Sequence, residues 1–229
     1  MLFSNKKMLK THKFKVTIDN YSIEQVEQFR YLGVILDNKL NWNAHINYVA
    51  LKLAQCAGVI YKSRKKVPQK VLLLIYNSLG AHYLRYGVAC WGAARDTALT
   101  RLKNLQKKII RYITNSPQDT NVDDKFRELG VLTLDEIYFQ EVAKFMYRNS
   151  NKTLPASFDE YFKPIDHTHY TRTKSQNVYS LPRPRTDFGK QSIKYNGIKI
   201  WSQVPCGIKS ITNKDSFNFQ IKTFLLVRS

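Results

Sequence analysis

Residues 29–46 read FRYLGVILDNKLNWNAHI and contain the change of pattern that decides the fold. Residues 29–36 are nearly continuous in apolar and β-branched side chains, which is typical of a strand covered on both faces. From residue 42 onward apolar residues recur three and four apart, which predicts an amphipathic helix over 42–62 with Asn41 as its N-cap. The members of this apolar stripe are Trp42, Ile46, Val49, Leu53, Ala57 and Ile60. A strand region that leads into helices predicts an α+β, mainly α-helical chain.

The residues before this stretch complete a small antiparallel sheet. Residues 14–18 and 21–23 read as two short strands, and Asp19-Asn20 supplies the turn between them. With residues 29–36 as the third strand, they predict a sheet region over 1–41.

Length and charge limit the partners of the chain. It has 229 residues and a formal net charge of +20, and residues 61–117 hold 12 Lys and Arg against the single acid Asp96. Cations concentrated in this way indicate a surface that binds the phosphates of nucleic acid. No apolar run is long enough to span a membrane, and the start does not resemble a signal peptide, because Met1-Leu2-Phe3 is followed at once by Ser4-Asn5-Lys6-Lys7. We therefore expect no membrane partner. We expect Met1 to lie inside a longer reading frame.

The cysteine count indicates the compartment. The chain has three cysteines, an odd number, and they are widely spaced. This pattern fits reduced thiols in an intracellular protein, either nuclear or cytoplasmic.

The basic stretch belongs to a predicted bundle of helices over 42–117. After Pro68 a second helix is expected, interrupted near Gly80 and resumed toward Trp91. Its expected inward residues are Val71, Leu72, Ile75 and Leu79. A third helix over 97–114 has an apolar side, formed by Leu99, Leu102, Leu105, Ile109 and Ile113, and a cationic side. The predicted phosphate-binding residues of this region are Arg64, Lys65, Lys66, Lys70, Arg101, Lys103, Lys107, Lys108 and Arg111.

Residues 118–229 predict a second helical region. A short helix over 122–129 closes on Gly130, and Thr133 with Glu136 forms a capping box for a helix that runs to about Asn149. A helical turn follows Pro155, and later elements are a strand or turn at 192–195, a helix through Trp201 and a last helix over 216–226.

An extended basic loop over 167–190 is expected within this second region. Arg172 and Arg185 are candidate phosphate ligands there, and nearby aromatic side chains are candidates to stack on unpaired bases. Those aromatic residues are Tyr170, Tyr179, Phe188 and Trp201. The alternative is that the basic faces are solvated surface and the aromatic residues belong to the core.

Few residues of the sequence are candidates for a catalytic role. Nucleotide polymerisation needs carboxylates that hold two Mg²⁺ ions, and the only adjacent Asp pair, Asp123-Asp124, fits the start of a helix better. Asp37 is either a lone ligand or, more simply, a turn residue. Asp166, His167 and His169 allow a metal site in which the fourth ligand is missing. We therefore assign no catalytic residue, no metal ligand and no cofactor to this chain.

The stretch 29–46, the block Tyr86-Gly87-x-x-x-Trp91-Gly92 and the block Arg185-Thr186-x-x-Gly189-Lys190 resemble one family, the reverse transcriptases of jockey-like non-LTR retrotransposons. The stretch 29–46 is similar to the segment that follows the polymerase palm. Tyr86-Gly87-x-x-x-Trp91-Gly92 resembles the thumb, and Arg185-Thr186-x-x-Gly189-Lys190 resembles the tail. The resemblance implies that Tyr31, Leu32 and Gly33 lie in a primer-grip-like strand and that the helices after it hold the template–primer duplex.

The resemblance also implies what is missing. The fingers, the endonuclease and the catalytic Asp residues precede this region in the family, so Mg²⁺ would belong to the absent palm. The leading hypothesis is a fragment of an RNA-directed DNA polymerase that grips RNA or an RNA–DNA duplex and is inactive alone, with no small-molecule substrate. The alternatives are a host-retained, non-enzymatic nucleic-acid-binding or scaffold protein and a protein-interaction module.

Overall fold

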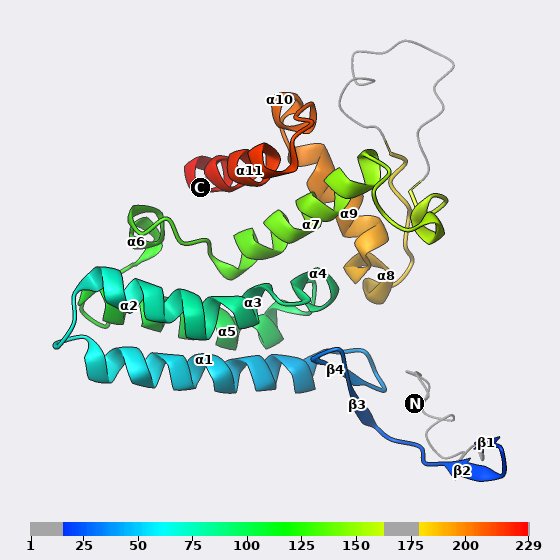
Figure 1. Cartoon of the computed structure of the whole chain (residues 1–229), viewed down its shortest axis with the longest axis horizontal. Helices are drawn as coiled ribbons and strands as arrows, with labels where there is room; N and C mark the ends of the chain where they lie inside the picture. Colours follow the sequence, from blue (N-terminus) through cyan, green and yellow to red (C-terminus); the bar gives the residue numbers. More distant parts are fainter. Residues whose placement is uncertain (1–15, 163–178, 229) are drawn as a thin grey trace.

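Two β-hairpins precede a succession of helices in the computed structural model, which describes residues 16–162 and 179–228 (Figure 1). The predicted α+β, mainly α-helical class is confirmed.

The predicted three-stranded sheet is wrong, because the strands form two separate hairpins. Strands β1 (Val16–Ile18) and β2 (Tyr21–Ile23) pair across Asp19 and Asn20, as expected. The stretch expected as one strand folds back on itself as β3 (Gln28–Tyr31) and β4 (Val34–Asp37). Leu32 and Gly33 form the turn, with φ of 45° and 82°, the left-handed backbone that two-residue hairpin turns require. Because the chain reverses there, β3 is exposed and is not covered on both faces.

Helix α1 (Asn43–Ser63) follows the hairpin, and its start differs from the expected cap. Trp42 occupies the N-cap position with φ of 66°, and the Asn41 side chain accepts a hydrogen bond from the Asn43 N–H instead. The Asp37 carboxylate accepts hydrogen bonds from the N–H groups of Lys39, Asn41 and Trp42 at 3.0, 3.3 and 3.0 Å. Asp37 is therefore a turn residue, as the simpler interpretation predicted.

The predicted interruption near Gly80 is confirmed as a π-helical turn. Helix α2 (Gln69–Tyr76) continues into η2 (Asn77–Ala81), α3 (His82–Arg85) and, after Gly87, α4 (Val88–Trp91). Leu72, expected to face inward, is buried, and so are Tyr76 at the end of α2 and Leu84 in α3. Val71 and Leu79 were expected to face inward but are 39% and 47% exposed.

The third helix, α5 (Asp96–Thr114), packs along α1 and is followed by α6 (Asp123–Glu128) and α7 (Leu134–Ser150). The predicted capping box at the start of α7 is confirmed, since Thr133 and Glu136 bond each other's backbone N–H groups. The predicted turn after Pro155 is the short 3-10 helix η3 (Ala156–Phe158).

The carboxy-terminal elements are helical where the structure describes them. They are α8 (Asp187–Gln191), α9 (Ile193–Gln203), α10 (Cys206–Lys209) and α11 (Lys214–Arg228). The extended loop predicted over 167–190 is thus wrong at its end, where the Thr186 side chain caps α8, and residues 163–178 lie outside the described residues. The strand or turn predicted at 192–195 is the N-cap and first turn of α9.

Two apolar clusters form the core and meet across α7. The first joins α1 to α5 and the start of α7 around Trp91 and Leu53, and the second joins the rest of α7 to α9 and α11 around Phe217 and Trp201. In Figure 1 the carboxy-terminal helices lie on one side of α7 and the helices α1 to α5 on the other.

Candidate nucleic-acid interface

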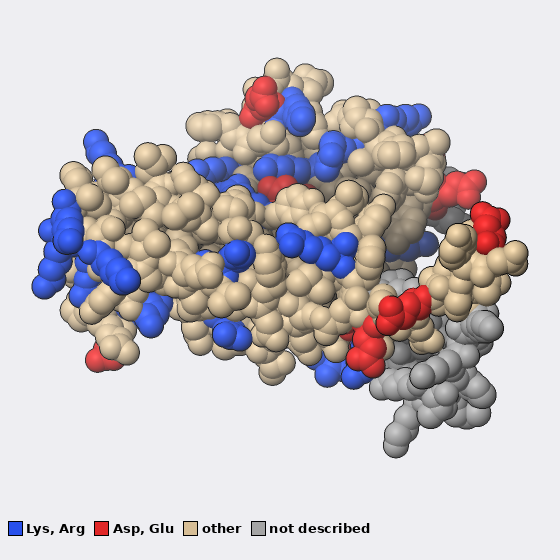
Figure 2. Space-filling model, turned by 60° about the horizontal axis from the view of Figure 1, so that its bottom comes forward, with Lys and Arg blue, Asp and Glu red and all other residues tan. Residues whose placement is uncertain are grey.

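The predicted phosphate ligands fall into two groups that the structure treats differently. Arg64, Lys65, Lys66 and Lys70 lie where α1 ends and α2 begins. The others lie along α5, whose carboxy-terminal end reaches the same place, because Tyr112 of α5 contacts Tyr61 of α1. Figure 2 shows Lys and Arg side chains gathered at this end of the molecule.

We call this surface the basic end and define it by six cations and two aromatic residues: Lys62, Arg64, Lys65, Lys66, Lys70, Lys108, Tyr61 and Tyr112. Lys62, Lys65, Lys66 and Lys70 are exposed, and none of them forms an ion pair within residues 16–162 and 179–228. Their charges are therefore available to an anionic partner.

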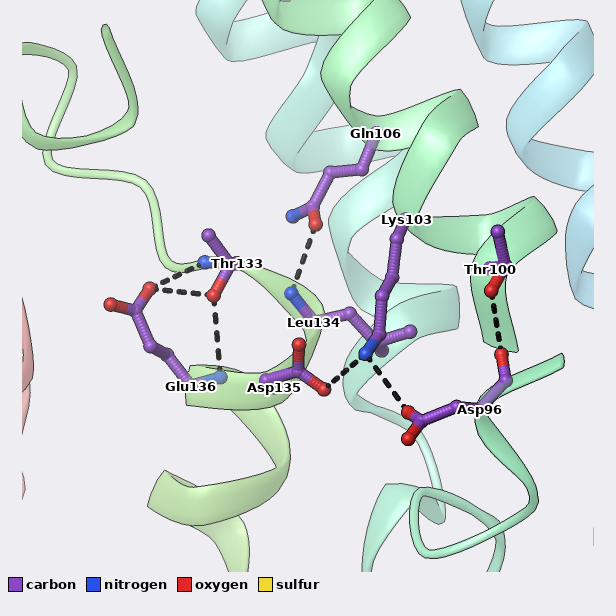
Figure 3. Close-up of polar contacts among 8 residues, drawn as sticks. All are labelled: Asp96, Thr100, Lys103, Gln106, Thr133, Leu134, Asp135 and Glu136. Atoms are coloured by element: carbon purple, nitrogen blue, oxygen red, sulfur yellow. Dashed lines mark hydrogen bonds and ion pairs between the residues drawn. The ribbon is translucent and has the colours of Figure 1, made fainter. Parts of the chain in front are cut away.

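Most α5 cations are occupied within the fold. Lys103 forms ion pairs with Asp96 and Asp135 at 3.3 and 2.9 Å, and Figure 3 shows its amino group between the two carboxylates. Lys107 pairs with Asp123 at 3.1 Å. These lysines join α5 to the starts of α6 and α7.

The protonation of these groups follows from the pairing. Partial burial alone would lower the pKa of Lys103, but the hydrogen bonds and charges of Asp135 and Asp96 outweigh it and raise the pKa above its ordinary value. The hydrogen bond from Lys107 lowers the pKa of Asp123. Asp123 thus acts as an ion-pair partner at a helix start, in agreement with the simpler interpretation of the Asp pair.

The two α5 arginines are also engaged. Arg111 Nε donates to the Thr120 carbonyl at 3.2 Å, and an Arg101 guanidinium nitrogen donates to Asn47 Oδ1 at 3.1 Å. Each bond uses only one of the donors of its guanidinium group, so further donors stay open to a partner. Arg101 and Arg111 therefore remain peripheral candidates.

Two of the three residues predicted to be primer-grip-like, Leu32 and Gly33, contact Tyr86, whereas the third, Tyr31, is exposed. The Tyr86 hydroxyl donates to the Leu32 carbonyl, and the Tyr86 ring lies so close to Gly33 that a Cβ there would be 3.2 Å away. Gly87, with φ of 63°, lets Val34 approach, because a Cβ would lie 3.0 Å from its Cγ2. Two motifs that are 54 residues apart thus form one joint.

The remaining candidates are not brought together with the basic end. Arg185 is exposed and lies just before Thr186, the N-cap of α8, which is at the opposite end of the molecule from the α1–α2 connection (Figure 1). Arg172, Asp166, His167, His169 and Tyr170 lie outside the described residues. Tyr179 and Trp201 were expected as stacking residues but are 8% and 3% exposed and belong to the core, whereas Phe188 is 59% exposed.

Two useful features were missed from the sequence. Tyr61 and Tyr112 flank the basic run, and the spacings Tyr61 to Arg64 and Lys108 to Tyr112, of three and four residues, were the available signal. Gln106 sits in the apolar stripe of α5, where a polar residue indicates a buried hydrogen-bond network.

Metal and membrane chemistry receive no support from the described ranges. Among residues 16–162 and 179–228, no three His, Cys, Asp or Glu side chains gather in a way that would hold a metal ion. Every helix in those ranges is too short or too polar to cross a bilayer.

Known proteins similar to this chain are RNA-directed DNA polymerases of mobile elements. Over 126 residues, 53% of this chain, it is 30% identical to a probable RNA-directed DNA polymerase from transposon X-element of Drosophila melanogaster. It is 29% identical to the polymerases from mobile element jockey of Drosophila melanogaster and Drosophila funebris, over 58% and 56% of the chain. The matched residues span only 14–15% of these relatives. No protein-family model and no solved structure matches the chain.

These similarities place the chain among sequences related to the reverse transcriptases of mobile elements. More narrowly, the resemblance to the jockey-like non-LTR reverse transcriptases is confirmed for somewhat more than half of the chain.

Proposed function

We propose that this chain grips template–primer nucleic acid, RNA or an RNA–DNA duplex, through its basic end as part of a jockey-like reverse transcriptase. The observation that carries the proposal is the set of exposed lysines on one end of the bundle that form no ion pair within residues 16–162 and 179–228, in a chain similar to RNA-directed DNA polymerases. Lysines placed in this way contact phosphates without reading bases, which suits a part that must hold any template.

The joint between the hairpin and Tyr86 gives the proposal a geometry. It fixes β3 and β4 against the bundle that carries the basic end, since Ile35 N–H also donates to His45 Nδ1 at 3.3 Å. A primer end at the hairpin and a duplex at the basic end would then be held by one rigid unit.

Nucleotide incorporation is assigned to the catalytic Asp residues of the palm, which we propose lie outside this chain. Purified chain is therefore expected to give no extension of a primed RNA template in Mg²⁺. Mg²⁺-dependent extension that persists in highly purified protein would contradict this assignment.

The binding proposal is tested by the salt dependence of affinity for a primed RNA template, measured by filter binding. We expect a steep linear fall of log affinity with log salt, and the slope should decrease by about 2 for Lys65→Ala with Lys66→Ala. The matched control is Lys199→Ala with Lys214→Ala, two exposed lysines on α9 and α11 that make the same change in net charge. Absent or salt-independent binding by the unmodified chain would refute the proposal.

The alternative of a host-retained, non-enzymatic binding protein uses the same surface. Binding alone does not separate the two, because a retained protein would keep the basic end for another partner. The preference between ligands does separate the two functions. A thumb-like role predicts tighter binding to a primed template than to single strands of equal charge, and competition at one salt concentration measures this difference.

A further inference from the structure

The basic end carries an aromatic and cationic stack between α1 and α5. The rings of Tyr61 and Tyr112 lie 5.0 Å apart between centroids, with their planes tilted by 56°. The Arg64 guanidinium lies over the Tyr61 ring at 4.4 Å and over the Tyr112 ring at 5.4 Å. Lys108 adds a charge 5.8 Å from the Tyr112 ring. Tyr61, Tyr112 and Arg64 therefore hold one another in place before any ligand binds.

Tyr61 is not a core residue. Half of its surface, 50%, is exposed, whereas tyrosines of the core such as Tyr76 and Tyr147 are 1% and 5% exposed. The Arg64 guanidinium lies over the Tyr61 ring, and half of the residue's surface faces solvent. A half-exposed aromatic residue beside cations is the kind of platform on which a nucleobase stacks.

The charges around Tyr61 suit the phosphates on either side of such a base. Lys62 and Lys65 flank it on α1 and the following turn, and Lys66 and Lys70 continue the cationic surface toward α2. No Asp or Glu occurs between residues 61 and 95, so no carboxylate of this segment repels the backbone. A helix surface that was merely solvated would need neither the ring nor the guanidinium held against it.

We infer that Tyr61 stacks on an unpaired base of a nucleic acid whose phosphates lie on the lysines of the basic end. This inference rests on the proposed function and names the part of the ligand that the basic end recognises. A base inside a duplex has both faces covered by its neighbours, so only a single-stranded or terminal nucleotide offers a face to Tyr61. The expected ligand is thus a junction between duplex and single strand.

The test compares two RNA hairpins of equal charge with the unmodified chain. One carries a short single-stranded purine extension, and the other carries the same extension with abasic nucleotides, so that phosphates are kept and bases are lost. Fluorescence anisotropy at one salt concentration should give about 5- to 100-fold tighter binding for the purine extension, the range typical of one stacked base. Because the protein is unaltered, misfolding of a variant does not enter the comparison.

Variants then assign the effect to Tyr61. Tyr61→Ala should abolish the preference for the purine extension over the abasic one, and Tyr61→Phe should keep it. Lys65→Ala with Lys66→Ala should lower the affinity for both hairpins by the same factor. Equal affinity of the unmodified chain for the two hairpins, or a preference that survives Tyr61→Ala, would overturn the inference and leave the proposed function standing. If the unmodified chain bound neither hairpin at low salt, the proposed function would fail together with this inference.

Discussion

Lysines occur both at the basic end and where α5 contacts the starts of α6 and α7, a contact region that we call the α5–α7 joint. The two regions differ in what surrounds these lysines. At the basic end, Lys65 and Lys66 are exposed and no acid lies near them in sequence, whereas Lys103 and Lys107 face acids from the starts of α6 and α7. The first arrangement leaves charge for a partner, and the second uses it to connect helices. The number of cations in a sequence segment therefore overestimates the charge available to a partner wherever the fold brings Asp or Glu side chains of other elements next to those cations.

The largest effect is expected from breaking the buried side of this joint. Gln106 is buried, and its amide donates to Tyr76 OH and the Leu132 carbonyl and accepts from Leu134 N–H, each at 2.9 Å. Figure 3 shows its bond to the first residue of α7. Gln106→Leu leaves these groups buried without partners, so unfolding free energy should fall by about 3 kcal/mol or more in urea denaturation. Gln69→Leu, at an exposed position on α2, is the control and should change it by less than about 0.5 kcal/mol. A loss below about 1 kcal/mol for Gln106→Leu would contradict the network's importance.

The next effect sharpens the comparison at the surface. Lys65→Glu with Lys66→Glu places repulsive charges on the basic end, and affinity for a primed RNA template should fall by about 100-fold at low salt. Lys103→Ala with Lys107→Ala should change that affinity far less, because those charges are already paired. Comparable losses in the two double variants, measured by anisotropy, would show that the joint and the basic end form one binding surface.

A smaller effect is expected on the pH dependence of stability, and it comes from His45 near the start of α1. The carboxy-terminal end of α1 bears the basic end, whereas near its start the buried His45 accepts a hydrogen bond from Ile35 N–H at Nδ1. Burial, and then the charge of Arg30, lower the pKa of His45 in the folded chain. The unfolded chain takes up a proton near pH 6.5, so stability should fall as pH drops below that value, by at most about 1.4 kcal/mol per pH unit.

His45→Asn tests this pH dependence. The Asn amide oxygen can replace Nδ1 as acceptor but does not titrate, so the fall in unfolding free energy between pH 7 and 5 should be smaller than in the unmodified chain. Urea denaturation at several pH values measures the difference. Identical pH profiles for the two proteins would exclude His45 as the group responsible.

Local patterns predicted the elements whose causes are local. The capping box of Thr133 and Glu136 and the helical stripe of α1 depend on residues within a few positions, and the structure confirms both. The hairpin β3–β4 was missed because its turn contains Leu32, which rarely adopts a positive φ. Its tip is held by the Tyr86 hydroxyl, 54 residues away, and no local pattern contains that contact.

The candidate site shows the same limit. Lys65 and Lys66 are exposed and Arg64 is half-buried, and their role in binding phosphates stays a prediction. The pairing of Lys103 with Asp135 spans 32 residues and depends on how α7 docks, so it was invisible before the fold was known. Leu79 was misplaced for a related reason, since it lies in the π-helical turn, where the helical spacing assumed for the apolar stripe does not hold.

The smallest expected effect concerns the ion pair between Lys103 and Asp135 in the α5–α7 joint. Lys103→Met and Asp135→Asn, alone and together, form a double-mutant cycle in which the loss of Asp135 from the first turn of α7 cancels. The side chains are 29% and 66% exposed, so the coupling free energy should be only about 0.5 kcal/mol and should shrink toward zero in about 1 M salt. Zero coupling at low salt, with a loss of RNA affinity on Lys103→Met, would move Lys103 from the joint to the binding surface. The expected coupling with unchanged RNA affinity would instead establish that Lys103 stabilises the contact between α5 and α7 and does not contribute to binding.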